Sequence, residues 1–188
     1  ELVKEYSEIY PNIRVEIFEN SYQDTPEILK SGKIDICLMS DNVPKGYHFH
    51  ELFEDKIMVL MPSNHPLAEN DKIELSQLNG FNMIMPKEPW CEVTRLIIEG
   101  KTVFPNAKHA TTSDVAAMAL CKNNQGLYIT SELHLQMMPE GLVAKEFKEK
   151  YSRKMGLIYK SMASATPSTR EFIKMADAFC KKNRINQL

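Results

Sequence analysis

The segment around Cys91 holds the residues whose types are best suited to chemistry. Cys91 follows the loop residues 86–90 and stands at the start of an expected helix over Trp90–Glu99. A helix N-terminus favours the thiolate and lowers the pKa of a cysteine. Trp90, the only tryptophan of the chain, offers an aromatic face beside it. Three interpretations of Cys91 remain open: a partly buried structural cysteine, a residue that lines a pocket, and a redox-reactive thiol.

Histidine and nucleophile patterns indicate neither a catalytic site nor a metal site. His48 and His50 share one face of an expected strand, but no third metal ligand lies near them in the sequence. The phosphate-binding patterns GxGxxG and GxxxxGKS/T are absent, and so are the GxSxG and HExxH patterns of hydrolases and zinc proteases. We therefore expect no metal, no cofactor and no enzymatic activity.

Composition excludes several further classes of protein. The 188 residues include 23 basic and 25 acidic ones, a net charge of −2, whereas a chain that binds nucleic acid by itself needs a basic face. No apolar run approaches the roughly 20 residues that span a bilayer. The length allows one large domain or two small lobes. No CxxC motif or tight cysteine spacing occurs, which favours a reducing compartment and a cytoplasmic location; the cysteines are Cys37, Cys91, Cys121 and Cys180.

Two groups of charged residues are interpreted as solvated surface, which is the usual place of charge runs. For the basic group, contact with an anion or a partner is the alternative. The acidic group is Glu51, Glu54 and Asp55, and the basic group is Lys145, Lys150, Arg153 and Lys154.

The first forty residues alternate between helix and strand patterns. Apolar residues recur with a helical period over Leu2–Ile9, and polar and apolar residues alternate strictly over Ile13–Glu19 as in a half-exposed strand. We expect a short helix over Thr25–Lys30, with Thr25 as its cap, and then a buried parallel strand over Ile34–Met39. This order indicates an α/β fold.

The rest of the chain continues in the same manner. Helices are expected over Asp114–Cys121 (with Ser113 as its cap), over Ser131–Met138, and from Thr166 onward. Strands are expected over Phe49–Phe53 and Ile57–Met61 (joined through Glu54–Lys56), Phe81–Met85, Ala107–Thr111, Gly126–Thr130, Leu142–Phe147 and Met155–Tyr159.

Several short strings then resemble one family in their order and spacing. One of them, residues 29–35, fits the pattern L-x-x-G-x-I/L-D. Together they cover nearly the whole chain, which is similar to the effector-binding (regulatory) domain of LysR-type transcriptional regulators. The strings are Tyr10–Glu16, Leu29–Asp35, Glu51–Asp55, His65–Ala68, Ile73–Leu78, Gly126–Ile129 and Pro139–Val143.

The resemblance implies a two-lobed α/β fold of the type 2 periplasmic-binding-protein kind, with two crossover strands and a central cleft. Lobe I would comprise residues 1–54 and 154–188, and lobe II residues 55–153. The crossings fall near Glu54–Asp55 and Arg153–Lys154, where we expect strands and no helix. The family's helix-turn-helix, its linker helix and the first strand of lobe I are expected upstream of Glu1.

The resemblance also implies where an effector would bind. The loop after the second family strand suggests Ser21 and Tyr22, and the end of the next strand suggests Ser40. From lobe II come two helix starts, Trp90 with Cys91 and Ser113 with Asp114. Hydroxyls and helix N-termini around one aromatic ring suit a small carboxylate-bearing or aromatic metabolite, although Glu88 and Asp114 would suit an amino group.

The expected function is sensing a small molecule and thereby controlling transcription. In this family the regulatory domains form homodimers, for which we expect apolar surface on the first helix (Val3, Tyr6) and on an edge strand of lobe I. DNA would be contacted only through the upstream helix-turn-helix, a full-length tetramer is an option, and no membrane is involved. The alternatives are a solute-binding protein of the same fold and a redox sensor that uses Cys91.

The redox alternative lacks its usual second cysteine. Peroxide-sensing members place a partner cysteine nine residues after the position of Cys91, where this chain has Gly100. Cys121 could replace it only if the two Cα atoms came within about 7 Å.

Overall fold

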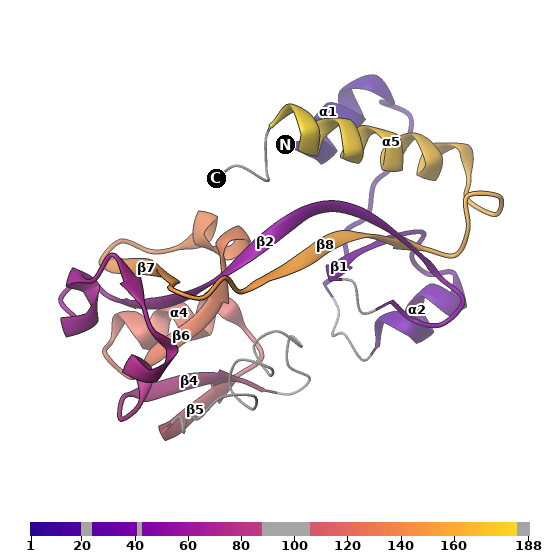
Figure 1. The fold of residues 1–188 in the computed structure, drawn as a ribbon. Helices are drawn as coiled ribbons and strands as arrows, with labels where there is room; N and C mark the ends of the chain where they lie inside the picture. The colour runs from indigo at the N-terminus through magenta and orange to yellow at the C-terminus, as the bar shows by residue number, and fades with distance from the viewer. Residues whose placement is uncertain (20–23, 41–42, 88–105, 184–188) are drawn as a thin grey trace. The chain divides into compact units, whose positions relative to one another are not determined.

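The structure is a computed structural model that describes residues 1–19, 24–40, 43–87 and 106–183. The chain divides into two compact units. Unit 1 comprises Glu1–Glu54 and Lys154–Leu188, and unit 2 comprises Asp55–Arg153. Two strands, β2 (His48–Pro62) and β8 (Ser152–Tyr159), have residues in both units (Figure 1).

Unit 1 combines three helices with a small sheet. The helices are α1 (Leu2–Ile9), α2 (Thr25–Ser31) and α5 (Pro167–Lys182), and the strand order is β1-β8-β2, with β1 spanning Cys37–Ser40. Helices α1 and α5 lie side by side (Figure 1).

Tyr6 joins these two helices. Its ring meets that of Phe172 edge-on at 5.1 Å between centroids, and its hydroxyl donates to the Ser168 carbonyl at 2.9 Å. Tyr6 is consequently buried, so it cannot supply the dimer surface expected of it.

The sequence predicts α5 closely because its start signal is local. Thr166 Oγ1 accepts the Thr169 amide at 3.1 Å, and Pro167 occupies the first turn, where a missing amide hydrogen costs nothing. The apolar face of α5, including Ile173 and Ala176, packs on Leu157 of β8.

Unit 2 is a mixed sheet with the order β3-β7-β2-β6-β4-β5. Strand β2 pairs antiparallel with β6 and β7, whereas β4 runs parallel to β5 and β6. The elements are β3 (Lys72–Ile73), β4 (Asn82–Pro86), β5 (Asn106–Thr111), β6 (Leu127–Ser131), β7 (Leu142–Phe147), α4 (Asp114–Lys122) and the 3-10 helices η1 (Pro66–Glu69), η2 (Leu75–Leu78) and η3 (Glu132–Met137).

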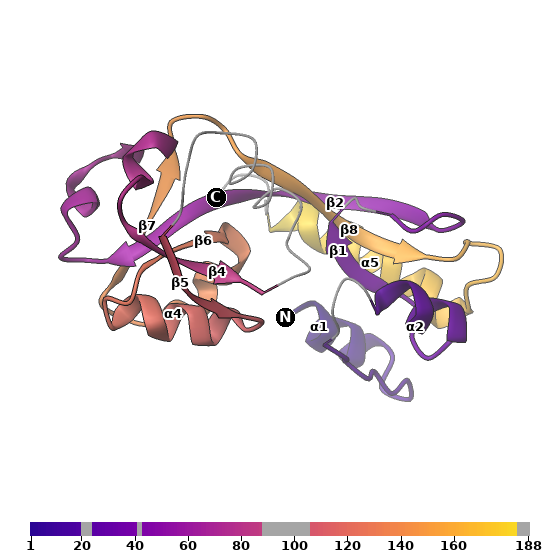
Figure 2. The same cartoon turned by 90° about the horizontal axis from the view of Figure 1, so that it is seen from below.

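Both faces of this sheet are covered. Val59 and Met61 pack with Ile73 and Leu78 on one face, while Leu60 packs with Met118 of α4 on the other. Successive strand residues point to opposite faces, so the unbroken apolar run of β2 marks a strand buried on both sides. Helix α4 packs on β4, β5 and β6 (Figure 2).

The structure corrects several expectations. The charged residues 54–56 do not divide two strands, because β2 continues through them. The described residues Ile13–Glu19 form no strand, and Ile17 is 79% exposed. Strand β1 is antiparallel to β8, and its Leu38 is half-exposed, so it is not a buried parallel strand.

The cap residue of α2 also differs from the prediction. Asp24, not Thr25, stands at the cap position of α2. No described helix is long and apolar enough to cross a membrane.

Candidate functional site

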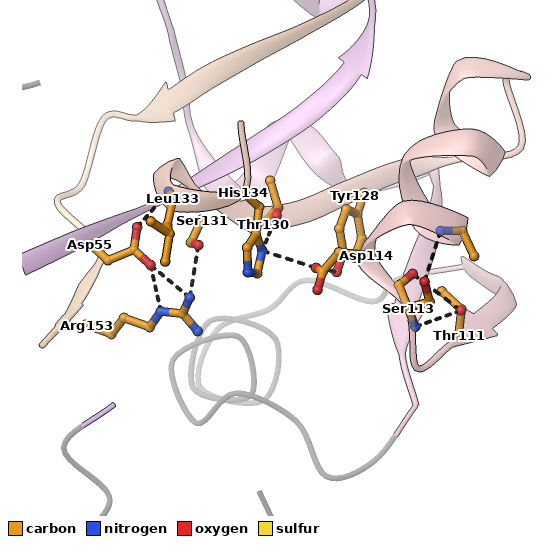
Figure 3. A network of polar contacts seen from close by, with 11 residues as sticks. Asp55, Thr111, Ser113, Asp114, Tyr128, Thr130, Ser131, Leu133, His134 and Arg153 are labelled. Carbon is orange, nitrogen blue, oxygen red and sulfur yellow. Dashed lines mark hydrogen bonds and ion pairs between the residues drawn. The ribbon is translucent and has the colours of Figure 1, made fainter. Parts of the chain in front are cut away.

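A group of polar residues of unit 2 lies at one edge of its sheet. Because β4, β5 and β6 are parallel, their carboxyl ends at Pro86, Thr111 and Ser131 reach the same edge, and α4 begins there. Ligands of α/β sheets commonly bind outside the carboxyl ends of parallel strands. We name these residues the carboxyl-edge cluster: Thr111, Ser113, Asp114, Tyr128, Thr130, Ser131 and His134 (Figure 3).

Ser113 caps α4 as predicted. Its Oγ accepts the Ala116 amide at 3.3 Å, and its own amide donates to Thr111 Oγ1 at 3.0 Å. These two contacts fix the direction of the first turn of α4. They also place Thr111 and Ser113, from the end of β5 and the start of α4, side by side (Figure 3).

Asp114 contacts two side chains from other elements. Tyr128 donates its hydroxyl to Asp114 Oδ1 at 2.5 Å, and His134 Nδ1 lies 3.2 Å from the same oxygen. The contact with His134 holds the pKa of Asp114 below its ordinary value, against the opposing effect of burial, and the Tyr128 hydroxyl acts in the same direction. Asp114 is therefore an anion at neutral pH, and its carboxylate contacts Tyr128 and His134 of the same unit.

His134 has two possible partners on one nitrogen. Its Nδ1 lies 3.2 Å from Thr130 Oγ1 as well as 3.2 Å from Asp114. A protonated Nδ1 donates to the carboxylate, whereas a bare Nδ1 accepts the Thr130 hydroxyl. The local hydrogen bonding thus depends on where the imidazole proton sits.

A buried ion pair flanks the cluster. Arg153 donates from Nε to Asp55 Oδ2 at 2.9 Å, and its Nη2 lies 2.8 Å from the same oxygen. Their side chains are 9% and 1% exposed, so the interpretation of both charges as solvated is wrong. Arg153 Nη2 also donates to Ser131 Oγ at 3.0 Å, and the Leu133 amide donates to Asp55 Oδ1 at 3.0 Å.

The predicted site residues fall into three groups. Ser113 and Asp114 lie in the carboxyl-edge cluster. Ser40 is in unit 1, buried at the end of β1 and opposite Met155 of β8. The others, Ser21, Tyr22, Trp90 and Cys91, lie outside the described residues.

The histidine pair considered for a metal has other neighbours. His50 Nε2 lies 3.4 Å from Asp177 of α5, and the ring of His48 stacks on Tyr159 at 6.0 Å between centroids. Within the described residues, no three His, Cys, Asp or Glu side chains lie together as metal ligands would.

Sequence reasoning missed Tyr128, Thr130, Ser131 and His134 as site residues. One usable signal was present, because Thr130 and Ser131 are polar residues at the end of a mostly apolar strand, β6, which runs parallel to its neighbour β4. Polar residues at that position reach the carboxyl edge of a sheet. The partnership of Asp55 with Arg153 had no local signal.

Comparison with known families identifies the chain. The model of the LysR substrate binding domain matches residues 1–181. The chain belongs to this family. The resemblance predicted from the short strings is therefore confirmed.

Individual relatives agree with this assignment. The chain is 26% identical over 183 residues to the uncharacterized HTH-type transcriptional regulator YvbU of Bacillus subtilis, covering 93% of the chain and 60% of YvbU. It is 30% identical over 84 residues to the hydrogen peroxide-inducible genes activator of Haemophilus influenzae, covering 44% and 28%. The chain therefore spans 60% or less of the length of these regulators.

Solved structures share the fold. The effector binding domain of QuiR in complex with shikimate has a TM-score of 0.82 at 20% identity, covering 96% of this chain and 89% of that one. The regulatory domain of Synechocystis CcmR in complex with 2-PG has a TM-score of 0.88 at 17% identity, with the same coverage. The predicted α/β, periplasmic-binding-protein-like fold is confirmed.

Proposed function

We propose that this LysR substrate-binding domain is the effector-sensing part of a longer transcriptional regulator. A small molecule bound here would alter DNA binding by a helix-turn-helix elsewhere in the protein. The observation that carries the proposal is the carboxyl-edge cluster, which assembles hydroxyls, an imidazole and a helix N-terminus at the edge where α/β sheets bind ligands. The domain would act by binding and would catalyse no reaction, in line with relatives that are transcriptional regulators.

The two units correspond, in this proposal, to the two lobes of the family, with lobe I formed by residues 1–54 and 154–188 and lobe II by residues 55–153. Lobe I would contribute Ser21, Tyr22 and Ser40 to effector binding. Lobe II would contribute Trp90, Cys91, Ser113 and Asp114, together with His134 of the same cluster.

The effector class we favour is a small carboxylic acid with further polar groups. Hydroxyls can donate to such a ligand, and the imidazole of His134 beside Asp114 offers a further polar contact. The QuiR domain, which has the same fold, binds shikimate, a hydroxylated carboxylic acid. This supports the class of ligand without naming the compound.

A thermal-shift screen of the full-length protein tests the proposal, with small carboxylates, amino acids and aromatic acids as probes. A ligand at 100 times its dissociation constant adds about 2.7 kcal/mol, which raises the melting temperature by roughly 5–11 °C for a domain of this size. The shift should shrink in His134→Gln and persist in His48→Gln, which removes an exposed histidine from unit 1. A shift that both variants retain would exclude the cluster as the binding site.

Redox sensing through Cys91 is a weaker alternative. Its candidate partner, Cys121, is fully buried, and burial raises the pKa of its thiol to about 12. Such a thiol is almost wholly protonated at neutral pH and is a poor nucleophile. A melting temperature that changes with peroxide, with the change lost in Cys91→Ser, would reverse this preference.

We also propose that the protein is a cytoplasmic homodimer that dimerises partly through unit 1. Ile9 of α1 is 59% exposed, and Leu38 of β1, an edge strand among the described residues, is 50% exposed. Apolar residues exposed on an edge strand favour pairing with another chain. Sedimentation of the variant Leu38→Lys should show a larger monomer fraction, and an unchanged distribution would remove Leu38 from the interface.

A further inference from the structure

The 3-10 helix η3 takes its N-terminal cap from a distant strand. Its own cap residue, Ser131, makes no side-chain bond to the first turn, although serine commonly caps in this way. The Leu133 amide donates instead to Asp55 Oδ1 in β2. Ser131 Oγ instead accepts a hydrogen bond from Arg153 Nη2 (Figure 3).

The register of the sheet explains why Asp55 can reach this turn. Strand β6 ends at Ser131, which lies opposite Ile57 of β2. Asp55 is two residues earlier in β2 and thus projects from the same face of that strand, just beyond the end of β6. The cap is consequently set by the pairing of β2 with β6, not by residues next to η3.

Asp55 and Arg153 are also the first and last residues of unit 2. Two residues into the unit, the Ile57 amide donates to the Tyr151 carbonyl at 2.8 Å and ties the same two segments again. In unit 1, Lys154 Nζ lies 2.8 Å from Glu51 Oε2, and these side chains are 56% and 48% exposed. The same two strands thus carry one buried and one exposed ion pair.

We propose that Asp55 and Arg153 are positioning residues of the effector site. They set the β6–η3 turn, which carries Thr130, Ser131 and His134, and fasten it to both strands that leave unit 2. A ligand that displaces this turn would therefore displace β2 at Asp55 and β8 at Arg153. This inference rests on the proposed function for the existence of an effector. The positioning of the turn depends only on contacts within unit 2.

Hydrogen exchange of the full-length protein without ligand tests the positioning. The double variant Asp55→Leu/Arg153→Met replaces the pair by apolar side chains, a change that often preserves stability. It removes the carboxylate acceptor of Leu133 and the donor of Ser131. We expect amides of residues 131–137 to exchange at least tenfold faster, while the core strand β4 keeps its protection. Asp55→Asn/Arg153→Met, which keeps an oxygen at position 55 and leaves no unpaired buried charge, should give a smaller increase in the same segment.

The matched control is Glu51→Gln/Lys154→Met, which removes the exposed pair from the same two strands. It should change exchange in residues 131–137 by less than twofold. Unchanged exchange there in Asp55→Leu/Arg153→Met would overturn the positioning role, and so would a rise that is equal in β4. The ligand screen and the exchange experiment can fail separately. If no ligand raises the melting temperature but the expected exchange pattern is seen, the proposed function is overturned and the positioning of the turn stands.

Discussion

Removing the Tyr128 hydroxyl should destabilise the protein through Asp114. Tyr128 is 6% exposed and donates to a carboxylate, and a hydrogen bond to a charged group contributes about 1.5–3 kcal/mol. The Asp114 side chain is 37% exposed, so water replaces part of the lost donor. We therefore expect Tyr128→Phe to cost about 1.5 kcal/mol at pH 7, measured by equilibrium urea unfolding.

The matched control is Tyr151→Phe, which also lies in unit 2 and removes a hydroxyl that donates to the exposed Glu149. Its cost should stay below about 0.5 kcal/mol, as for most surface changes. Equal costs for the two variants would refute the conclusion that Asp114 depends on its buried donor.

The pH dependence of the free energy of unfolding tests the same contact in a second way. The folded-state pKa of Asp114 lies below its ordinary value of 3.8, so its contribution to stability is complete above that value. The contribution is lost as the pH falls through the folded pKa. The difference between Tyr128→Phe and the parent should accordingly shrink between pH 7 and about pH 3. A difference that stays constant would mean that Tyr128 acts through packing, not through the carboxylate.

Three further predictions concern packing and capping within the two units. Gly156→Ala should destabilise unit 1 by about 1–3 kcal/mol in urea unfolding, because a Cβ there would lie 2.4 Å from the His50 carbonyl oxygen and 2.7 Å from the Phe49 ring. A stability equal to that of the parent would contradict the close approach of β8 to β2. Burial raises the pKa of the Cys121 thiol from an ordinary 9.0 to about 12, so at pH 8 it should react with iodoacetamide about a thousandfold more slowly than an unfolded cysteine. Peptide mass spectrometry after a labelling pulse measures this rate. Labelling within tenfold of the unfolded rate would count against the burial of Cys121. Thr166→Ala should lower the free energy of unfolding by about 1 kcal/mol through loss of the α5 cap, whereas Ser161→Ala, which leaves that cap intact, should cost less.

The carboxyl-edge cluster was predictable in part. Ser113 and Asp114 follow from a local signal, a capping serine before an apolar helix, and the structure has that cap. His134 lies outside any motif and joins Asp114 only because β6 and α4 pack together. A contact between elements of this kind depends on strand order, which a short stretch of sequence does not contain.

Local rules account for what the sequence determined by itself. The family follows from short strings in a fixed order. Helix α5 follows from Thr166 and Pro167, and β7 follows from its own pattern and has the predicted bounds, Leu142–Phe147. Each of these signals acts over a few residues, where propensity, capping and alternation decide the outcome.

Only the tertiary structure decided the roles of Asp55 and Arg153. Each stands in a run of charged residues, the usual mark of a solvated face, yet the two are buried against each other across 98 positions of sequence. Burying one charge alone is prohibitive, so neither residue carries a signal of burial until strand pairing supplies its partner. For the same reason, the charges that looked like a break in β2 are the point where that strand is held to β8 and to the β6–η3 turn.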